Sequence, residues 1–184
     1  MNCYDIEKVG IIINKISLLL LTILLLLVGC QKLDFEREGP FAVYTYYILG
    51  PDDYRNFYQT VISVYDDGQV LLTTKENDDL QIGPDAPRVE TKVNREQIVE
   101  LQQLIETNKL WQSEEDLSDY DSVDGASQYI TIHLTDESKT IGGQNPNDES
   151  FLKVFNYIHH LIDPDEFSAW HDDIREYIYE RNPD

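Results

Sequence analysis

The stretch Thr60-Val-Ile-Ser-Val-Tyr-Asp-Asp-Gly-Gln-Val-Leu-Leu-Thr-Thr74 decides the fold, because two apolar runs flank Asp66-Asp67-Gly68. Asp-Gly between such runs is the strongest short-range signal for a β-hairpin, since glycine adopts the positive φ of the turn without steric cost. Both runs are rich in β-branched residues, which favour strands. We therefore expect a hairpin here and an antiparallel sheet built around it.

The residues before this hairpin predict a further strand. The segment Phe41-Ala-Val-Tyr-Thr-Tyr-Tyr-Ile48 is β-branched and aromatic, and Gly50-Pro51 ends it. Because large side chains alternate onto both of its faces, we expect other protein to lie against it on both sides. Five tyrosines fall within fifteen residues: Tyr44, Tyr46, Tyr47, Tyr54 and Tyr58. We expect these rings to pack under the C-terminal helices, and the alternative is an exposed contact platform for a peptide or a glycan.

The residues after the hairpin predict an edge strand and a helix. Residues 75–87 are polar and indicate a loop, and residues 88–93 indicate the edge strand. A helix begins at Asn94, whose side chain can cap it while Gln97 reaches back to complete a capping box. The apolar stripe of this helix consists of Ile98, Leu101, Leu104 and Ile105. Trp111 follows, and we expect it to pack under the end of the helix.

A second hairpin and two helices complete the chain. Residues 129–134 place Ile130, Ile132 and Leu134 on one face, and residues 139–141 return after a polar turn. Residues 148–162 and the segment that begins at Asp163-Pro164 carry apolar residues at helical spacing. The order predicts a single α+β domain: a mainly antiparallel sheet, built from two hairpins plus an N-terminal strand, with about three amphipathic helices packed against it.

An apolar run near the start of the chain indicates export. Residues 16–28 are apolar except for Ser17 and Thr22, with lysines before them. Thirteen helical residues span only about 20 Å, which is less than the roughly 30 Å of hydrocarbon in a bilayer. A short apolar stretch that ends in small residues is typical of a secretory signal.

The four residues at the end of this run, Leu27-Val28-Gly29-Cys30, resemble a bacterial lipobox. The resemblance implies that Cys30 receives a diacylglyceryl group and that residues 1–29 are removed as a signal peptide. An uncleaved anchor with a chance cysteine is the alternative. We expect residues 30–40 to form a lipidated acidic tether, residues 41–184 to form the domain, and the lipid on Cys30 to hold the protein in the cell membrane or outer envelope.

Composition excludes several classes of function. After removal of residues 1–29, the chain holds 33 acidic and 12 basic residues and a net charge of −21. This charge argues against a nucleic-acid partner, because phosphate binding needs concentrated Lys and Arg. The two cysteines are Cys3, in the signal, and Cys30, so the sequence predicts neither a disulfide nor Cys-based catalysis in the domain.

Three further segments resemble, in pattern, a loose group of small secreted domains of unknown function found in bacterial lipoproteins. They are Ile62-Ser-Val-Tyr-Asp-Asp-Gly-Gln-Val70, Gln97-Ile-Val-Glu-Leu-Gln-Gln-Leu-Ile105, and Asp124-Gly125 leading into Tyr129-Ile-Thr-Ile132. The resemblance spans about residues 59–162. It implies a fold and supplies no activity.

The acidic loop and the histidines are the candidates for a metal site. The loop holds six carboxylates: Glu114, Glu115, Asp116, Asp119, Asp121 and Asp124. Ca²⁺ takes oxygen ligands from such loops, but Val123 stands where an EF-hand would place its third ligand. We expect a solvated loop, and calcium at residues 114–125 is the alternative. The histidines are His133, His159, His160 and His171, and no two are four residues apart, so we expect no zinc and no cofactor.

Motifs for common enzyme classes are absent from the sequence, which contains no G-x-S-x-G, P-loop or G-x-G-x-x-G pattern. We therefore expect a non-catalytic binding or interaction module with a protein or glycan partner in the envelope. The alternative is a hydrolase that acts on envelope polymers through paired carboxylates. A buried acid pair with a raised pKa would favour the enzyme, whereas an exposed tyrosine patch without such a pair would favour binding.

Overall fold

The computed structural model describes residues 32–49, 55, 58–121 and 125–183, and residues 34–184 form one compact unit. Cys30 and the expected signal peptide lie outside the described residues. The strands are β1 (Pro40–Leu49), β2 (Thr60–Tyr65), β3 (Gln69–Thr74), β4 (Val89–Lys92), β5 (Gly125–His133) and β6 (Ser138–Gln144). The helices are α2 (Arg95–Thr107), α3 (Glu149–His159) and α4 (Pro164–Arg181), with short 3₁₀ turns η2 (Asp78–Leu80) and η3 (Leu110–Gln112).

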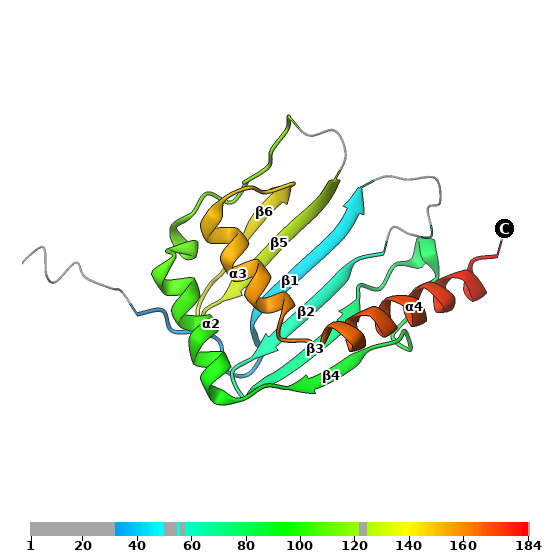
Figure 1. Ribbon diagram of the computed structural model, residues 1–184, viewed down its shortest axis with the longest axis horizontal. Helices are drawn as coiled ribbons and strands as arrows, with labels where there is room; N and C mark the ends of the chain where they lie inside the picture. The colour runs from blue at the N-terminus through cyan, green and yellow to red at the C-terminus, as the bar shows by residue number, and fades with distance from the viewer. Residues whose placement is uncertain (1–31, 50–54, 56–57, 122–124, 184) are drawn as a thin grey trace, which may run out of the picture. The chain divides into compact units, whose positions relative to one another are not determined.

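The strands of the described chain form one antiparallel sheet in the order β4-β3-β2-β1-β5-β6 (Figure 1). The expected α+β fold is confirmed. The two predicted hairpins are β2–β3 and β5–β6, and β1 joins them at the centre of the sheet. The predicted edge strand at residues 88–93 is β4, which lies at one end of the order.

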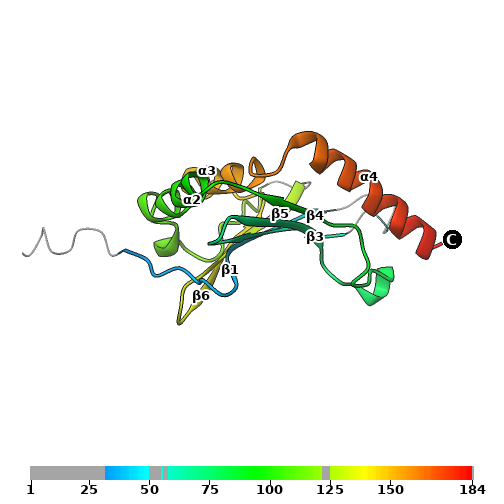
Figure 2. The same cartoon turned by 90° about the horizontal axis from the view of Figure 1, so that it is seen from below.

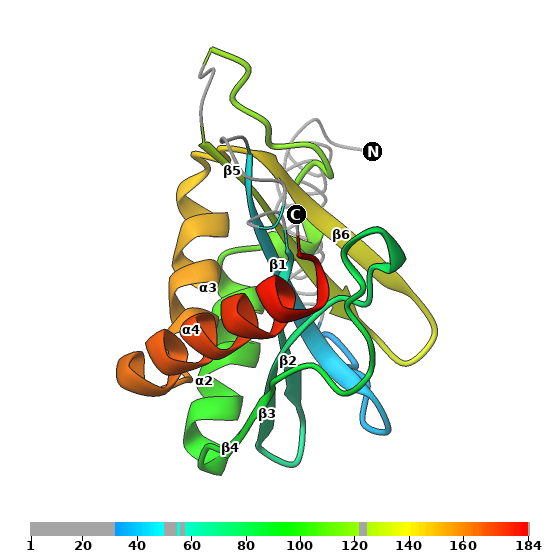
Figure 3. The same ribbon diagram turned by 90° about the vertical axis from the view of Figure 1, so that its right-hand side faces the viewer.

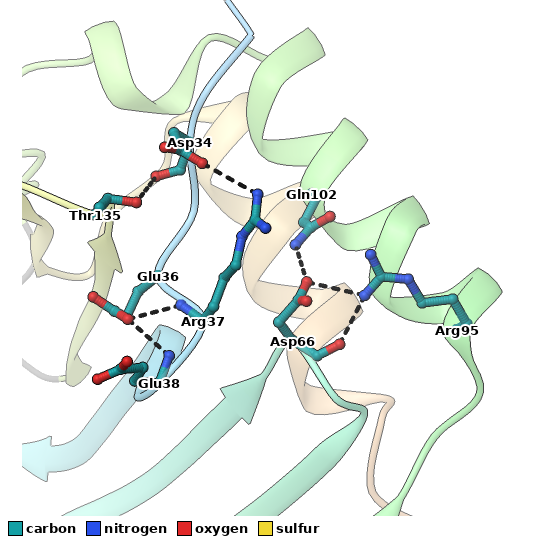
Figure 4. A network of polar contacts seen from close by, with 8 residues as sticks. All are labelled: Asp34, Glu36, Arg37, Glu38, Asp66, Arg95, Gln102 and Thr135. Carbon is teal, nitrogen blue, oxygen red and sulfur yellow. Dashed lines mark hydrogen bonds and ion pairs between the residues drawn. The ribbon is translucent and has the colours of Figure 1, made fainter.

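The turn of the first hairpin has the geometry that its sequence predicts. Gly68 takes a φ of 91°, and its N–H donates to the carbonyl of Tyr65 over 3.0 Å. The Asp66 carboxylate accepts from the Arg95 guanidinium (2.9 Å) and the Gln102 amide (3.0 Å), both on α2 (Figure 4). The turn is therefore tied to the helix that packs beside it.

Helices α2, α3 and α4 lie on the same face of the sheet (Figure 2). The strands bury their alternate side chains under this layer: Tyr44, Ile62, Val64, Val70, Leu72, Ile130, Ile132 and Ile141. The helices contribute Ile98, Leu101, Ile105, Phe151, Val154, Ile158, Trp170, Ile174 and Ile178. Removal of these apolar side chains from water is the main favourable term in folding.

The helix ends follow their sequence signals. Asn94 accepts from the Gln97 N–H, and the Gln97 side chain accepts from the Asn94 N–H, so the predicted capping box is present. Asp163 accepts from two backbone N–H groups at the start of α4, and Pro164 is the first residue of that helix. Trp111 is only half-buried, whereas Leu110 fills the core below α2, so the prediction for Trp111 assigned the buried position to the wrong neighbour.

Helix α4 is fixed to the loop between β3 and β4 (Figure 3). The Trp170 indole N–H donates to the Pro87 carbonyl over 2.8 Å, and the Tyr177 hydroxyl donates to Asp85 over 2.6 Å. Near the end of the helix, the Asn182 amide donates to the Leu80 carbonyl over 2.5 Å. A loop that looks merely polar in the sequence is therefore held by hydrogen bonds to α4 and to the residue that follows it.

The expected tether of residues 30–40 is shorter in the structure, because the domain begins at Asp34. Phe35 is only 7% exposed and packs edge-on against Phe41, with 5.4 Å between ring centroids. The Asp34 carbonyl accepts from the Thr135 N–H and from the Thr135 hydroxyl (Figure 4). The Glu36 N–H donates to the His133 carbonyl. One buried phenylalanine and these hydrogen bonds dock the segment on β5, which its acidic composition did not indicate.

Candidate functional site

The face of the sheet opposite the helices carries a shallow depression of about 530 Å³. We call it the open-face trough. Its lining residues are Thr45, Tyr47, Gln59, Val61, Thr73, Thr74, Lys75, Tyr129, Thr131 and Thr140. The prediction that β1 would be covered on both sides is wrong for the described chain, in which the helices cover one face and Val43, Thr45 and Tyr47 stay partly exposed on the other.

Strand register brings these side chains together. Thr45 pairs with Tyr129 on β5 and with Val61 on β2, and Val61 pairs with Thr73 on β3. Neighbouring strands lie about 4.8 Å apart, so this row of four residues crosses roughly 14 Å of the sheet. Thr45, Val61 and Thr73 are short, and they form the floor of the open-face trough.

Two tyrosines flank this floor at its β5 end. The rings of Tyr47 and Tyr129 are stacked, with 6.4 Å between their centroids and 23° between their planes. Burial, together with the neighbouring Tyr47 phenol, raises the pKa of Tyr129. Tyr129 thus favours its protonated form, which joins a hydrogen-bonding O–H group to an apolar ring.

Hydroxyl groups and one cation complete the lining. The Thr131 and Thr140 hydroxyls hydrogen-bond each other over 2.9 Å. The buried Thr74 hydroxyl has no hydrogen-bond partner among the described residues. Lys75 is the one charged residue of the lining, although the whole chain has 35 acidic residues. The open-face trough is thus a carboxylate-free patch in a strongly acidic protein.

The tyrosine cluster predicted from the sequence divides between packing and exposure. Tyr44 and Tyr58 are buried, and Tyr44 packs edge-on against Phe155 of α3 with 4.8 Å between centroids. Tyr47 lies in the open-face trough, where it is partly exposed. Tyr54 lies outside the described residues. Packing is therefore confirmed for Tyr44 and Tyr58, whereas a contact role for the exposed members stays a prediction.

The acidic loop runs as an extended segment along β6. The Leu117 N–H donates to the Gly142 carbonyl and the Asp119 N–H to the Gln144 carbonyl, each over 2.8 Å. The Asp116 carboxylate accepts from the Ser118 N–H (2.9 Å) and the Tyr120 hydroxyl (2.8 Å). Bonds from Ser118 and Tyr120 lower the pKa of Asp116. In the described part of the acidic loop, backbone groups therefore bind β6, and the Asp116 carboxylate binds groups of the loop itself.

Close approach of two different neighbours, β5 and the acidic loop, explains the pair Gly142-Gly143. Their φ values are 149° and 156°, which L side chains rarely adopt. A Cβ on Gly142 would collide with the Gln128 carbonyl, and one on Gly143 would collide with Ser118. Glycine at position 142 therefore lets the β5 backbone approach closely, and glycine at position 143 lets the loop cover the outer edge of β6.

Metal ligation finds no support in the described residues, which contain no group of three or more His, Cys, Asp or Glu side chains placed to hold an ion. Asp124 lies outside them, so the calcium alternative for residues 114–125 stays a prediction. No helix of the described chain is long and apolar enough to cross a membrane.

Two histidines belong to an aromatic cluster between α3 and α4. Phe167 lies between them, 4.6 Å from the His159 ring and 4.7 Å from the His171 ring by centroids. The Tyr58 oxygen is 2.6 Å from His171 Nδ1. Burial raises the pKa of Tyr58 and lowers the pKa of both histidines. Burial thus favours the uncharged form of all three rings, and which atom donates in this bond depends on the tautomer of His171.

Carboxyls with a shifted pKa all move downward in the described chain. They are Glu36, Asp66, Asp85, Asp116 and Glu149. For Asp66, burial opposes the shift and is outweighed by hydrogen bonds from Arg95 and Gln102. A general acid of a glycosidase needs the opposite, a carboxyl whose pKa is raised.

No protein-family model matches this chain, and no curated protein matches it either. The similarity to lipoprotein domains of unknown function therefore stays an expectation, and the chain's own geometry carries the functional argument.

Sequence reasoning missed the open-face trough, although a signal for it exists. In each central strand, large apolar residues alternate with small or hydroxylated ones. Val43 and Thr45 on β1 and Thr131 on β5 belong to this second set. Such alternation is typical of a sheet with one solvated face. The tyrosines of β1 obscured it, because large rings on both faces resemble a strand that is buried on both sides.

Proposed function

We propose that this protein is exported, anchored in the cell envelope by lipid on Cys30, and binds a protein or glycan partner non-catalytically through the open-face trough. The observation that carries the binding proposal is the lining: two stacked tyrosines, a floor of short side chains and no carboxylate, in a chain with a net charge of −21. Tyrosine rings offer large rigid contact area and a polar hydroxyl at low entropic cost, and they are enriched where proteins bind.

The carboxyl groups support binding over the alternative, a carboxylate-dependent hydrolase. Every described carboxyl with a shifted pKa is more acidic than usual, because it accepts hydrogen bonds that favour its charged form. A catalytic pair would instead hold one carboxyl protonated near neutral pH. The lipobox supports the envelope location, and the acidic composition supports a partner other than nucleic acid.

Photo-cross-linking on intact cells tests this function. A benzophenone-bearing phenylalanine replaces Thr73, on the floor of the trough, or Asp173, on the exposed side of α4. Benzophenone inserts into C–H bonds and therefore captures a protein or a glycan. We expect light to couple the protein to envelope material from position 73 and not from position 173. Coupling from position 173 alone would contradict the assignment of the open-face trough.

The same cells test the anchor through a Cys30→Ser arm. We expect a metabolic fatty-acid label on the wild type and none on the variant, since the thiol is the proposed lipid acceptor. Membrane attachment should be lost together with the label. Equal labelling of the two proteins would contradict the anchor while leaving the cross-linking result interpretable.

A further inference from the structure

Backbone groups in the floor of the open-face trough are already engaged. The floor lies on β1, β2 and β3, whose N–H and C=O groups pair with each other across the sheet. A ligand on this face therefore meets side chains only. Those side chains offer hydroxyls, one amide, one amine and two phenol rings.

Both edges of the sheet in the described chain are unsuited to the addition of a strand by an extended peptide. The outer edge of β6 is hydrogen-bonded to residues 115–119 of the acidic loop. The opposite edge is β4, a strand of four residues that carries Glu90 and Lys92. Short charged edge strands resist strand addition. A peptide would thus have to bind on the face, without the main-chain bonds that give such complexes their affinity.

A sugar ring fits what the face does offer. One side of a pyranose presents C–H groups, which suit the stacked rings of Tyr47 and Tyr129, and its rim presents hydroxyls that donate and accept. Hydrogen bonds of both kinds, donated and accepted, can come from the hydroxyls of Thr45 and Thr131 and from the amide of Gln59. A tyrosine is suited to such a ligand because it joins an apolar ring to a hydrogen-bonding tip.

Charge and shape narrow the class of sugar. A polyanionic sugar would be repelled by a protein of net charge −21, and Lys75 is the single cation in the lining that could attract it. The row of paired residues Tyr129, Thr45, Val61 and Thr73 crosses four strands and is roughly 14 Å long, which exceeds one ring. A neutral chain that stays extended can follow this row, whereas a coiled chain would touch it at one unit.

The short tether between Cys30 and the domain indicates where such a glycan would come from. Asp34 is hydrogen-bonded to Thr135, just after β5, and it follows Cys30 by four residues. Four residue steps reach at most about 14 Å. A lipid on Cys30 would therefore hold the domain close to its membrane, beside polymers of the envelope itself.

We infer that the open-face trough binds an extended, neutral, β-linked glycan strand of the cell envelope, an inference that rests on the proposed function and names the class of its ligand. Tyr47 and Tyr129 stack on the sugar rings. The threonine hydroxyls and Gln59 hold the hydroxyl rim, and Lys75 borders one end of the row.

Calorimetric titration of the full processed protein with defined oligosaccharides tests this inference. The probes are chitohexaose, which is neutral, β-1,4-linked and extended; maltohexaose, which is neutral, α-linked and coiled; and hexagalacturonate, which is anionic. We expect chitohexaose to bind at least tenfold more tightly than either of the other two. Tyr47→Ala should weaken chitohexaose binding at least tenfold. Thr45→Val should weaken it less, because this change removes only one hydroxyl and leaves both tyrosine rings in place.

Tyr120→Ala is the matched control, since Tyr120 is 75% exposed and lies in the acidic loop, outside the lining. It should leave chitohexaose affinity unchanged. Equal affinity for maltohexaose, tighter binding of hexagalacturonate or an unaffected Tyr47→Ala variant would each overturn the inference. If chitohexaose does not bind but position 73 still cross-links a protein in cells, the glycan class is wrong and the binding surface stands; if neither occurs, both proposals are wrong.

Discussion

His159 and His171 are residues whose charge state depends on the fold. Their rings are half-buried on either side of Phe167, and burial lowers the pKa of each. For His171, the positive charge of Arg175 acts in the same direction and the negative charge of Asp172 opposes it. Protonation would place two cations in an aromatic cluster, so the folded state disfavours it.

This arrangement predicts a loss of stability in mild acid. An unfolded histidine titrates near pH 6.5, so below that pH the unfolded chain binds more protons than the folded one. The free energy of unfolding should therefore fall as the pH drops from 7.5 through 6.5 to 5. Urea unfolding of the wild type and of a double variant, His159→Gln with His171→Gln, measures this.

The difference between the two pH profiles isolates the histidines. Acidification also neutralises part of the net charge of −21, but that effect is common to both proteins. We expect the double variant to lose less stability than the wild type between pH 7.5 and 5. Parallel profiles would show that the two imidazoles do not titrate differently in the folded state.

Local residue choices were largely predictable from the sequence. The capping box of Asn94 and Gln97, the Asp-Gly turn at Gly68 and the cap at Asp163 each depend on residues within a few positions. The requirement for Gly142 and Gly143 was not predictable, because it arises from residues that are distant in sequence, such as Ser118. Contacts of that kind have no local signature.

At the scale of elements, α4 is an integral part of the domain. Trp170 is 1% exposed, packs near Tyr58 and His171, and donates its indole N–H to the Pro87 carbonyl. Trp170→Ala removes this contact and leaves a cavity, and large-to-small changes of this type cost roughly 3–5 kcal/mol. The melting temperature should fall by at least about 6 °C, at 2–4 °C per kcal/mol for a domain of this size.

Two further substitutions calibrate this result. Trp170→Phe keeps most of the ring volume and loses the N–H, so its melting temperature should lie between those of the wild type and Trp170→Ala. Asp173→Ala changes an exposed residue on the same helix and should have little effect. An unchanged melt for Trp170→Ala would show that α4 adds nothing to the stability of the domain.

Elements were easier to predict individually than to place. The strands and helices follow from hydrophobic spacing, but the position of β1 at the centre of the sheet does not. The docking of residues 115–119 on β6 and of Phe35 on the domain also went unrecognised. Both segments are acidic, and composition alone made each of them resemble solvated chain.

At the scale of the whole domain, the two faces of one sheet differ in what covers them. The helices cover one face and supply the buried core, while the other face keeps short hydroxylated side chains and two tyrosines. Substitutions in the open-face trough should therefore affect binding more than stability. This separation lets ligand binding be tested without confusion from unfolding.

The most direct test of the open-face trough is the affinity for isolated cell envelopes of a variant that lacks both rings. Tyr47→Ala combined with Tyr129→Ala should raise the dissociation constant at least tenfold, a loss of about 1.4 kcal/mol, because both stacking surfaces are gone. Tyr120→Ala, which removes an exposed tyrosine elsewhere, should bind as the wild type does. Equal affinity of the double variant and the wild type for these envelopes would contradict the assignment of this face as the binding surface.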